Sequence, residues 1–117
     1  VAAALDWMHE KHPAVPIWLA GFSFGCYAGL KAAVDDERVE RMFAVAPAVN
    51  LWDFSFMRSE TRPVKVIHGT VDELVPYEMV SAWIELLDSG DYSEIEGAGH
   101  FFPEHAQALQ SALLSNL

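Results

Sequence analysis

Three residues of this 117-residue chain could together perform nucleophilic catalysis, and they occur in the order Ser23, Asp72, His100. Ser23 lies in the segment Gly-Phe-Ser-Phe-Gly, whose glycines allow a sharp turn between a strand and a helix. A serine hydroxyl is a weak nucleophile until a neighbouring base accepts its proton, and that base needs a carboxylate that orients it. His100 and Asp72 are candidates for these two roles, because each follows a segment that we expect to be a strand.

The elements that must position these residues follow from the periodicity of apolar residues. We expect strands at 15–20, 41–48, 64–68 and 91–95. We expect helices at 1–11, 25–34, 77–87 and 103–115. This alternation predicts an α/β fold, a mostly parallel sheet of about four strands with helices on both faces. The carboxyl ends of such strands share one sheet edge, so the three candidate residues should meet there.

The composition indicates a packed domain and excludes several classes of function. Hydrophobic residues make up 52% of the chain, and its length predicts a single domain over 1–117. The formal charge of −10 would repel nucleic-acid phosphates and anionic membrane surfaces. No apolar run reaches the roughly 20 residues of a membrane span, and the single cysteine, Cys26, excludes an internal disulfide. Because the chain begins within a helical pattern and without Met, we expect it to be cut from a longer protein.

Three motifs in this order resemble those of the α/β-hydrolases. Gly-Phe-Ser-Phe-Gly matches the nucleophile elbow, His-Gly-Thr-Val-Asp-Glu-Leu-Val-Pro resembles the segment with the family's acid, and Gly-Ala-Gly-His-Phe-Phe resembles its histidine loop. The resemblance implies that Ser23 is the nucleophile, Asp72 the acid and His100 the base, with the Phe24 backbone amide as one oxyanion donor. It also implies that residues 1–117 are the C-terminal portion of the fold, without the early strands and the loop that supplies the second oxyanion amide.

A finer resemblance implies a reaction class. The segment Trp52-Asp53-Phe54 and the His-Phe-Phe ending of the third motif resemble small bacterial serine hydrolases, of the dienelactone-hydrolase-like and carboxylesterase kind. This implies a cytoplasmic enzyme, without cofactor or metal, that cleaves a small-molecule carboxylic ester or thioester through an acyl-enzyme. A peptidase or acyltransferase would use the same triad, and a truncated non-catalytic interaction module is a third interpretation. The nucleophile strand would have an unpaired edge, through which a homodimer or another partner could bind.

Several other residues have alternative interpretations. Four aromatic residues could either contact substrate or pack in the core: Phe22, Trp52, Phe54 and Phe101. Asp53 is an alternative acid, because some members of the family take it from that position. Glu73, next to Asp72, is a further alternative acid, but we expect it to be a solvated loop charge. His68 is expected to be a buried hydrogen-bonding residue, and Cys26 a small core residue.

Overall fold

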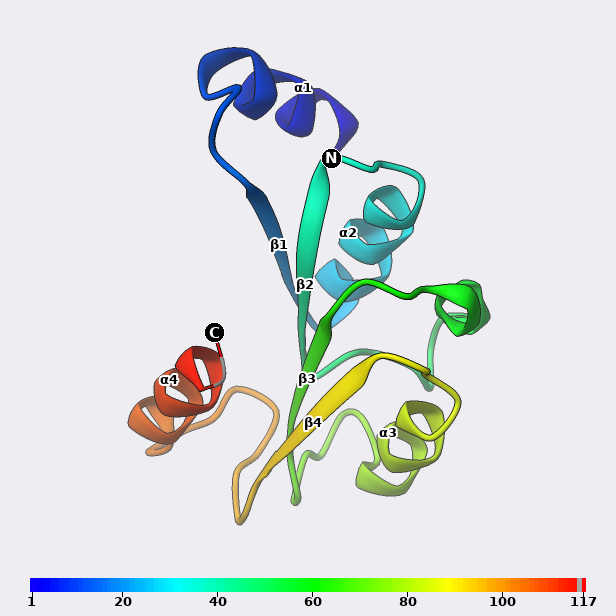
Figure 1. Cartoon of the computed structure of the whole chain (residues 1–117). Coiled ribbons are helices and arrows are strands. Elements are labelled where there is room, and N and C mark those ends of the chain that lie inside the picture. Colours follow the sequence, from blue (N-terminus) through cyan, green and yellow to red (C-terminus); the bar gives the residue numbers. More distant parts are fainter. Residues whose placement is uncertain (116) are drawn as a thin grey trace.

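A computed structural model describes residues 1–115 and 117 and contains one sheet of four parallel strands (Figure 1). The strands are β1 (Ile17–Phe22), β2 (Val39–Val45), β3 (Val64–Gly69) and β4 (Gly90–Ile95). Each strand pairs in parallel with the next strand along the chain, so their order in the sheet is β1-β2-β3-β4. The predicted α/β class, with a parallel sheet of about four strands, is confirmed.

The helices form a layer on each face of the sheet. They are α1 (Ala2–Lys11), α2 (Phe24–Val34), the short 3₁₀ helix η1 (Ser55–Ser59), α3 (Tyr77–Ile84) and α4 (Ala106–Leu114). Crossovers between parallel strands are right-handed, so connections that all step in one direction lie on one face. Accordingly α2 and α3 pack on one face, whereas α4, which follows the last strand, packs on the other against β3 and β4 (Figure 1). No helix in the described residues is long and apolar enough to cross a membrane.

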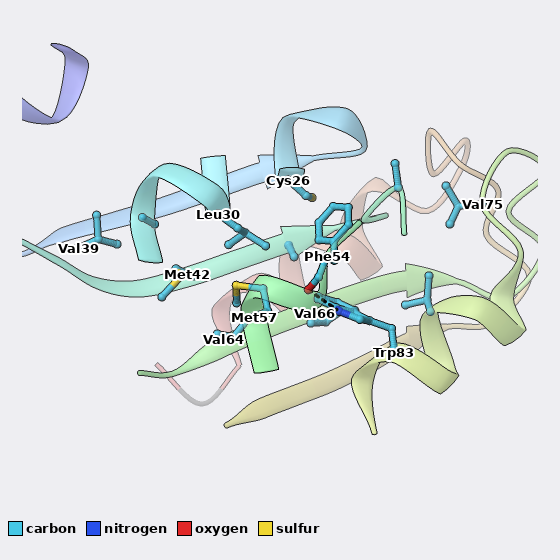
Figure 2. Packing of buried hydrophobic residues seen from close by; sticks show 14 of the residues in the cluster. Cys26, Leu30, Val39, Met42, Phe54, Met57, Val64, Val66, Val75 and Trp83 are labelled. Atoms are coloured by element: carbon cyan, nitrogen blue, oxygen red, sulfur yellow. Dashed lines mark hydrogen bonds between the residues drawn. The ribbon is translucent and has the colours of Figure 1, made fainter. Parts of the chain in front are cut away.

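Each face of the sheet has its own core. The larger core lies beneath α2, η1 and α3, and it includes Leu30, Met42, Met57, Val66 and Trp83 (Figure 2). The smaller core lies beneath α4 and consists of these buried residues: Val45, Ala46, Ile67, Ile95, Ala98 and Phe102. Strands covered on both faces need apolar side chains at successive positions, which explains the nearly continuous apolar runs in the sequence.

β1 lies at the edge of the sheet in the described residues, and it both begins and ends two residues later than the predicted strand at 15–20. Its last residues pair with Ala44 and Val45 of β2, and the Ser23 N–H donates a hydrogen bond of 2.9 Å to the Val45 carbonyl. The backbone pairing of the sheet therefore reaches Ser23 itself. Trp18 and Phe22 of this edge strand are exposed. Association through this edge stays a prediction.

Two elements end or begin at other residues than predicted because of left-handed backbone conformations. Ala46 has a φ of 48°, so β2 ends at Val45 and does not reach residue 48. Phe102 and Glu104 have φ values of 53° and 64°, which an α-helix cannot contain. The prediction that Pro103 opens the last helix is therefore wrong, and α4 begins at Ala106.

The turn between β1 and α2 depends on a close approach at Gly21. A Cβ atom there would lie 2.7 Å from Cα of Cys26, whereas a Cβ at Gly25 would have no atom within 4 Å. Ser23 between them has a φ of 55° and a ψ of −119°, a conformation that residues with a Cβ rarely adopt. Gly21 therefore permits the close packing of the strand and the helix, whereas this packing does not require a glycine at position 25.

Backbone contacts join the loops that follow β3 and β4. The Thr70 N–H donates to the Ile95 carbonyl at 3.1 Å, and the Val71 N–H donates to the Ala98 carbonyl at 3.1 Å. A Cβ at Gly69 would clash with the same Ala98 carbonyl, so only glycine permits this approach. The two loops are therefore held together by their main chains.

A side chain adds a further bond between these loops. The exposed Glu73 accepts, through Oε2, a hydrogen bond of 3.2 Å from the backbone N–H of His100. The same oxygen would lie 2.9 Å from a Cβ atom at Gly99. Glu73 is therefore more than the solvated loop charge that the sequence predicted, since it fixes the backbone of the histidine loop.

We expect Gly21→Ala and Gly25→Ala to affect stability differently. The methyl group at position 21 would meet backbone atoms that cannot move without displacing α2, so unfolding should become easier by about 1–3 kcal/mol. At position 25 alanine has open space within a helix and should be neutral or stabilising by up to about 1 kcal/mol. Urea unfolding of the two variants side by side measures the difference. Equal destabilisation would contradict the packing argument.

We expect Glu73→Ala to loosen the backbone of the histidine loop. One hydrogen bond contributes roughly 0.5–1.5 kcal/mol, so the His100 amide should exchange with solvent about 2–10-fold faster. Glu73→Gln keeps an oxygen acceptor and should preserve most of the protection. Glu96→Ala is the control, because it removes an exposed carboxylate from the histidine loop itself. Hydrogen exchange followed by NMR measures all three, and unchanged exchange in Glu73→Ala would refute the role of this bond.

Candidate active site

The sheet edge brings Ser23, His100 and Asp72 into one hydrogen-bonded row. His100 Nε2 lies 3.0 Å from Ser23 Oγ, and His100 Nδ1 lies 2.8 Å from Asp72 Oδ2. A carboxylate oxygen only accepts hydrogen bonds, so Nδ1 carries the proton and Nε2 is left to accept from the serine hydroxyl. In this tautomer the histidine can take the proton of Ser23 while the carboxylate orients the ring.

The Asp72 carboxylate is buried and fixed by the loop that contains it. Oδ1 accepts hydrogen bonds from the Leu74 N–H at 2.8 Å and from the Val75 N–H at 2.7 Å. Oδ2 faces the His100 ring at the other end. With each oxygen bonded to a donor, the burial of this charge is compensated and the carboxylate has one orientation.

Ser23 and Phe24 lie at the start of α2. The Phe24 N–H is the first amide of the helix and therefore has no intrahelical acceptor, and the partial positive charge of the helix N-terminus is located there. Such an amide can stabilise negative charge that develops beside the serine. Cys26, further into the helix, is fully buried, and burial raises the pKa of its thiol to about 12. The expectation that Cys26 is a core residue is confirmed.

Three of the four candidate aromatic residues are exposed next to this row. The ring centroid of Phe22 lies 5.1 Å from that of His100, and the ring of Phe101 lies 4.9 Å from it. Phe101 is 68% exposed and Phe22 is also exposed. Trp52 packs at 5.0 Å against the ring of Phe24, the residue after the serine. Phe22 and Phe101 therefore give the His100 ring exposed apolar neighbours, and Trp52 contacts the row through the ring of Phe24 alone.

Phe54 has a different environment, because its side chain is only 3% exposed. Its ring packs edge-on against Trp83 at 5.5 Å, and the Trp83 Nε1–H donates a hydrogen bond of 3.4 Å to the Phe54 carbonyl (Figure 2). Phe54 thus belongs to the larger core. It also borders a hollow of about 410 Å³, whose other residues include Trp52, Arg58, Met79 and Leu86.

The alternative acid Asp53 does not join the row. Its Oδ1 accepts the Ser55 N–H at 2.9 Å, and this hydrogen bond lowers the pKa of the exposed Asp53 carboxyl. Both ring nitrogens of His100 already have other partners, Ser23 and Asp72. Asp53 therefore acts in its own local turn.

Sequence reasoning missed how His68 and Glu73 contact this site. His68 is buried and its Nε2 lies 3.0 Å from the Val75 carbonyl, so the predicted buried hydrogen-bonding role is confirmed. The sequence did not indicate that His68 Nδ1 lies 3.7 Å from Asp72 Oδ2. A histidine four residues before an acid is the only signal that could have suggested this proximity. For Glu73, no pattern in the sequence indicated the bond to the His100 backbone.

Several solved structures are similar to this chain. No protein-family profile and no curated protein sequence matches the chain. An α/β serine hydrolase homologue from Coxiella burnetii is 34% identical with a TM-score of 0.92, over 99% of this chain and 56% of its own. An α/β serine hydrolase without lid from Xanthomonas campestris is 33% identical with a TM-score of 0.86, over 96% of this chain and 51% of its own. An esterase from an Arctic intertidal metagenomic library, 21% identical with a TM-score of 0.75 over 95% of this chain and 53% of its own, shares the fold.

The chain spans about half the length of these solved structures, whereas the likeness includes nearly all of its own residues. The two serine hydrolases agree with it in fold and in about a third of the aligned residues. The parallel sheet, with helices on both faces and a serine between β1 and α2, agrees with this likeness. The chain therefore belongs to the α/β-hydrolase superfamily.

Proposed function

We propose that the chain carries the catalytic residues of a serine hydrolase that cleaves a carboxylic ester or thioester. The observation that carries the proposal is the row from Ser23 through His100 to Asp72, with distances of 3.0 and 2.8 Å. The likeness to serine hydrolases and to an esterase supports the same reaction class.

The geometry allows the reaction to proceed through an acyl-enzyme. Ser23 Oγ attacks the acyl carbonyl carbon while His100 Nε2 accepts the hydroxyl proton, and the carbonyl oxygen becomes an oxyanion that the Phe24 amide stabilises. His100 then donates this proton to the departing alcohol or thiol. Water attacks the acyl-enzyme as His100 takes one of its protons, and the carboxylic acid leaves as Ser23 regains a proton. Asp72 keeps His100 in the required tautomer and stabilises the imidazolium.

The surroundings of Ser23 favour a substrate with an apolar group. Phe22 and Phe101 flank the His100 ring, and Trp52 lies beyond the ring of Phe24. These exposed rings can contact the acyl or alcohol part of an ester through apolar surface, whose burial contributes about 25 cal/mol per Å². A small apolar ester is therefore the appropriate first substrate.

We expect Ser23→Ala to abolish both labelling by a fluorophosphonate probe and hydrolysis of short p-nitrophenyl esters, because the attacking oxygen is removed. Asp72→Asn should lower turnover by about 10⁴-fold, since the amide favours the wrong histidine tautomer. Ser111→Ala, at an exposed serine of α4, is the matched control and should label like the unsubstituted chain. Labelling is read on a gel and hydrolysis by absorbance.

The outcomes separate the proposed function from its alternatives. Labelling that survives in Ser23→Ala would refute Ser23 as the nucleophile. A folded chain that is not labelled at all would favour a non-catalytic interaction module. Faster cleavage of aminoacyl anilides than of p-nitrophenyl esters would indicate a peptidase.

A further inference from the structure

His68 is a buried ionisable residue that the proposed mechanism does not use. It lies near the carboxyl end of β3, it is 0% exposed, and it faces the side of the sheet covered by α3. Its Nδ1 is buried and has no hydrogen-bond partner among residues 1–115 and 117. An unpartnered buried nitrogen beside a catalytic row calls for an explanation.

The other ring nitrogen of His68 fixes the tautomer. Nε2 lies 3.0 Å from the Val75 carbonyl oxygen, which can only accept a hydrogen bond, so Nε2 carries the proton. The N–H of the same Val75 donates to Asp72 Oδ1 at 2.7 Å. His68 therefore holds, through one residue, the loop that fixes the carboxylate.

In this tautomer the Nδ1 atom of His68 has only a lone pair. It lies 3.7 Å from Asp72 Oδ2, beyond hydrogen-bond distance, while His100 Nδ1 lies 2.8 Å from the same oxygen. A neutral His68 thus offers no proton to Oδ2. A protonated His68 would direct an N–H toward Oδ2 and compete with His100.

The charges around His68 come from several elements. Asp72 and His100 face it from the two loops, and Glu94 of β4 is its neighbour in the sheet, with its carboxylate accepting a hydrogen bond of 2.7 Å from the Tyr77 hydroxyl. Burial lowers the pKa of His68, outweighing the opposite effects of its hydrogen bond to the loop and of the Asp72 charge. The residue therefore stays neutral around pH 7.

We propose that His68 is a positioning residue whose neutral Nε2–H tautomer reserves Asp72 Oδ2 for His100, and whose protonation weakens the Asp72–His100 bond. The proposal rests on the proposed function, because it assigns His68 a role in the same row. It implies that protonation of His68 by itself impairs the row.

The first test is the protonation state of the two rings, which NMR of ¹⁵N-labelled imidazoles reads without any need for activity. At pH 7 we expect His68 protonated on Nε2 only and His100 protonated on Nδ1. As pH falls, the resonance of the His100 Nδ1 proton should shift when His68 titrates. A proton on His68 Nδ1 at pH 7, or a His100 resonance that ignores the His68 titration, would overturn the proposal.

The second test uses the rate of fluorophosphonate labelling as a function of pH. As the pH falls through the pKa of His68, the labelling rate should fall more steeply in the unsubstituted chain than in His68→Gln. Glutamine does not titrate and keeps an N–H that can reach the Val75 carbonyl. His68→Leu removes this donor and should slow labelling at pH 7.5 by about tenfold. His9→Gln, at an exposed histidine of α1, is the control.

The role of His68 and the proposed hydrolase function can be refuted independently of each other. Equal slopes in His68→Gln and the unsubstituted chain would overturn the role of His68 while leaving the proposed hydrolase intact. A folded chain without any labelling would refute the proposed function, and the NMR titration would still decide whether His68 reserves the carboxylate.

Discussion

The main-chain contact between the loops after β3 and β4 is the interaction on which the candidate site depends. Hydrogen bonds from Thr70 and Val71 to carbonyls of the neighbouring loop hold the two loops together, and Gly69 leaves room for the Ala98 carbonyl. Asp72 lies on one of these loops and His100 on the other. The contact between the two backbones therefore brings the two side chains together. The relative position of the Asp72 and His100 backbones is thus set by packing that involves neither side chain, and the Leu74 and Val75 amides then orient the Asp72 carboxylate.

The side chains become more buried along the row from Ser23 to Asp72, and this suits the proposed proton transfer. Ser23 is partly exposed, whereas His100, Asp72 and His68 are buried. Hydrogen bonds in a water-poor environment are electrostatically stronger, but unsatisfied groups there are costly. The buried carboxylate is accordingly bonded at both oxygens, whereas Nδ1 of the neighbouring His68 has no hydrogen-bond partner among the described residues. Its lone pair directed at the carboxylate is tolerated because His100 already supplies the proton that this oxygen needs.

Apolar periodicity was sufficient to predict the parallel sheet. The position of Ser23, Asp72 and His100 after successive strands was sufficient to predict that they meet, because parallel strands end at one edge. Contacts set by loop conformation could not be predicted. The bond from Glu73 to the His100 backbone requires the close approach of two loops, and the late start of α4 requires left-handed residues that are not glycine. Residue type also did not distinguish the buried Phe54 from the exposed Phe101.

The candidate site consists of two separately supported halves. Close packing at Gly21 sets the turn that places both the Ser23 hydroxyl and the Phe24 amide, so the proposed nucleophile and the proposed oxyanion donor are fixed by one contact. The proposed base and the proposed acid, His100 and Asp72, are fixed by the other contact, between the loops. The halves meet at the hydrogen bond of 3.0 Å between Ser23 and His100 and at the packing of Phe22 on the His100 ring. In the proposed mechanism a proton crosses this junction when Ser23 attacks the substrate and again when Ser23 regains a proton. A small relative shift of the halves would therefore impair proton transfer while leaving each half intact.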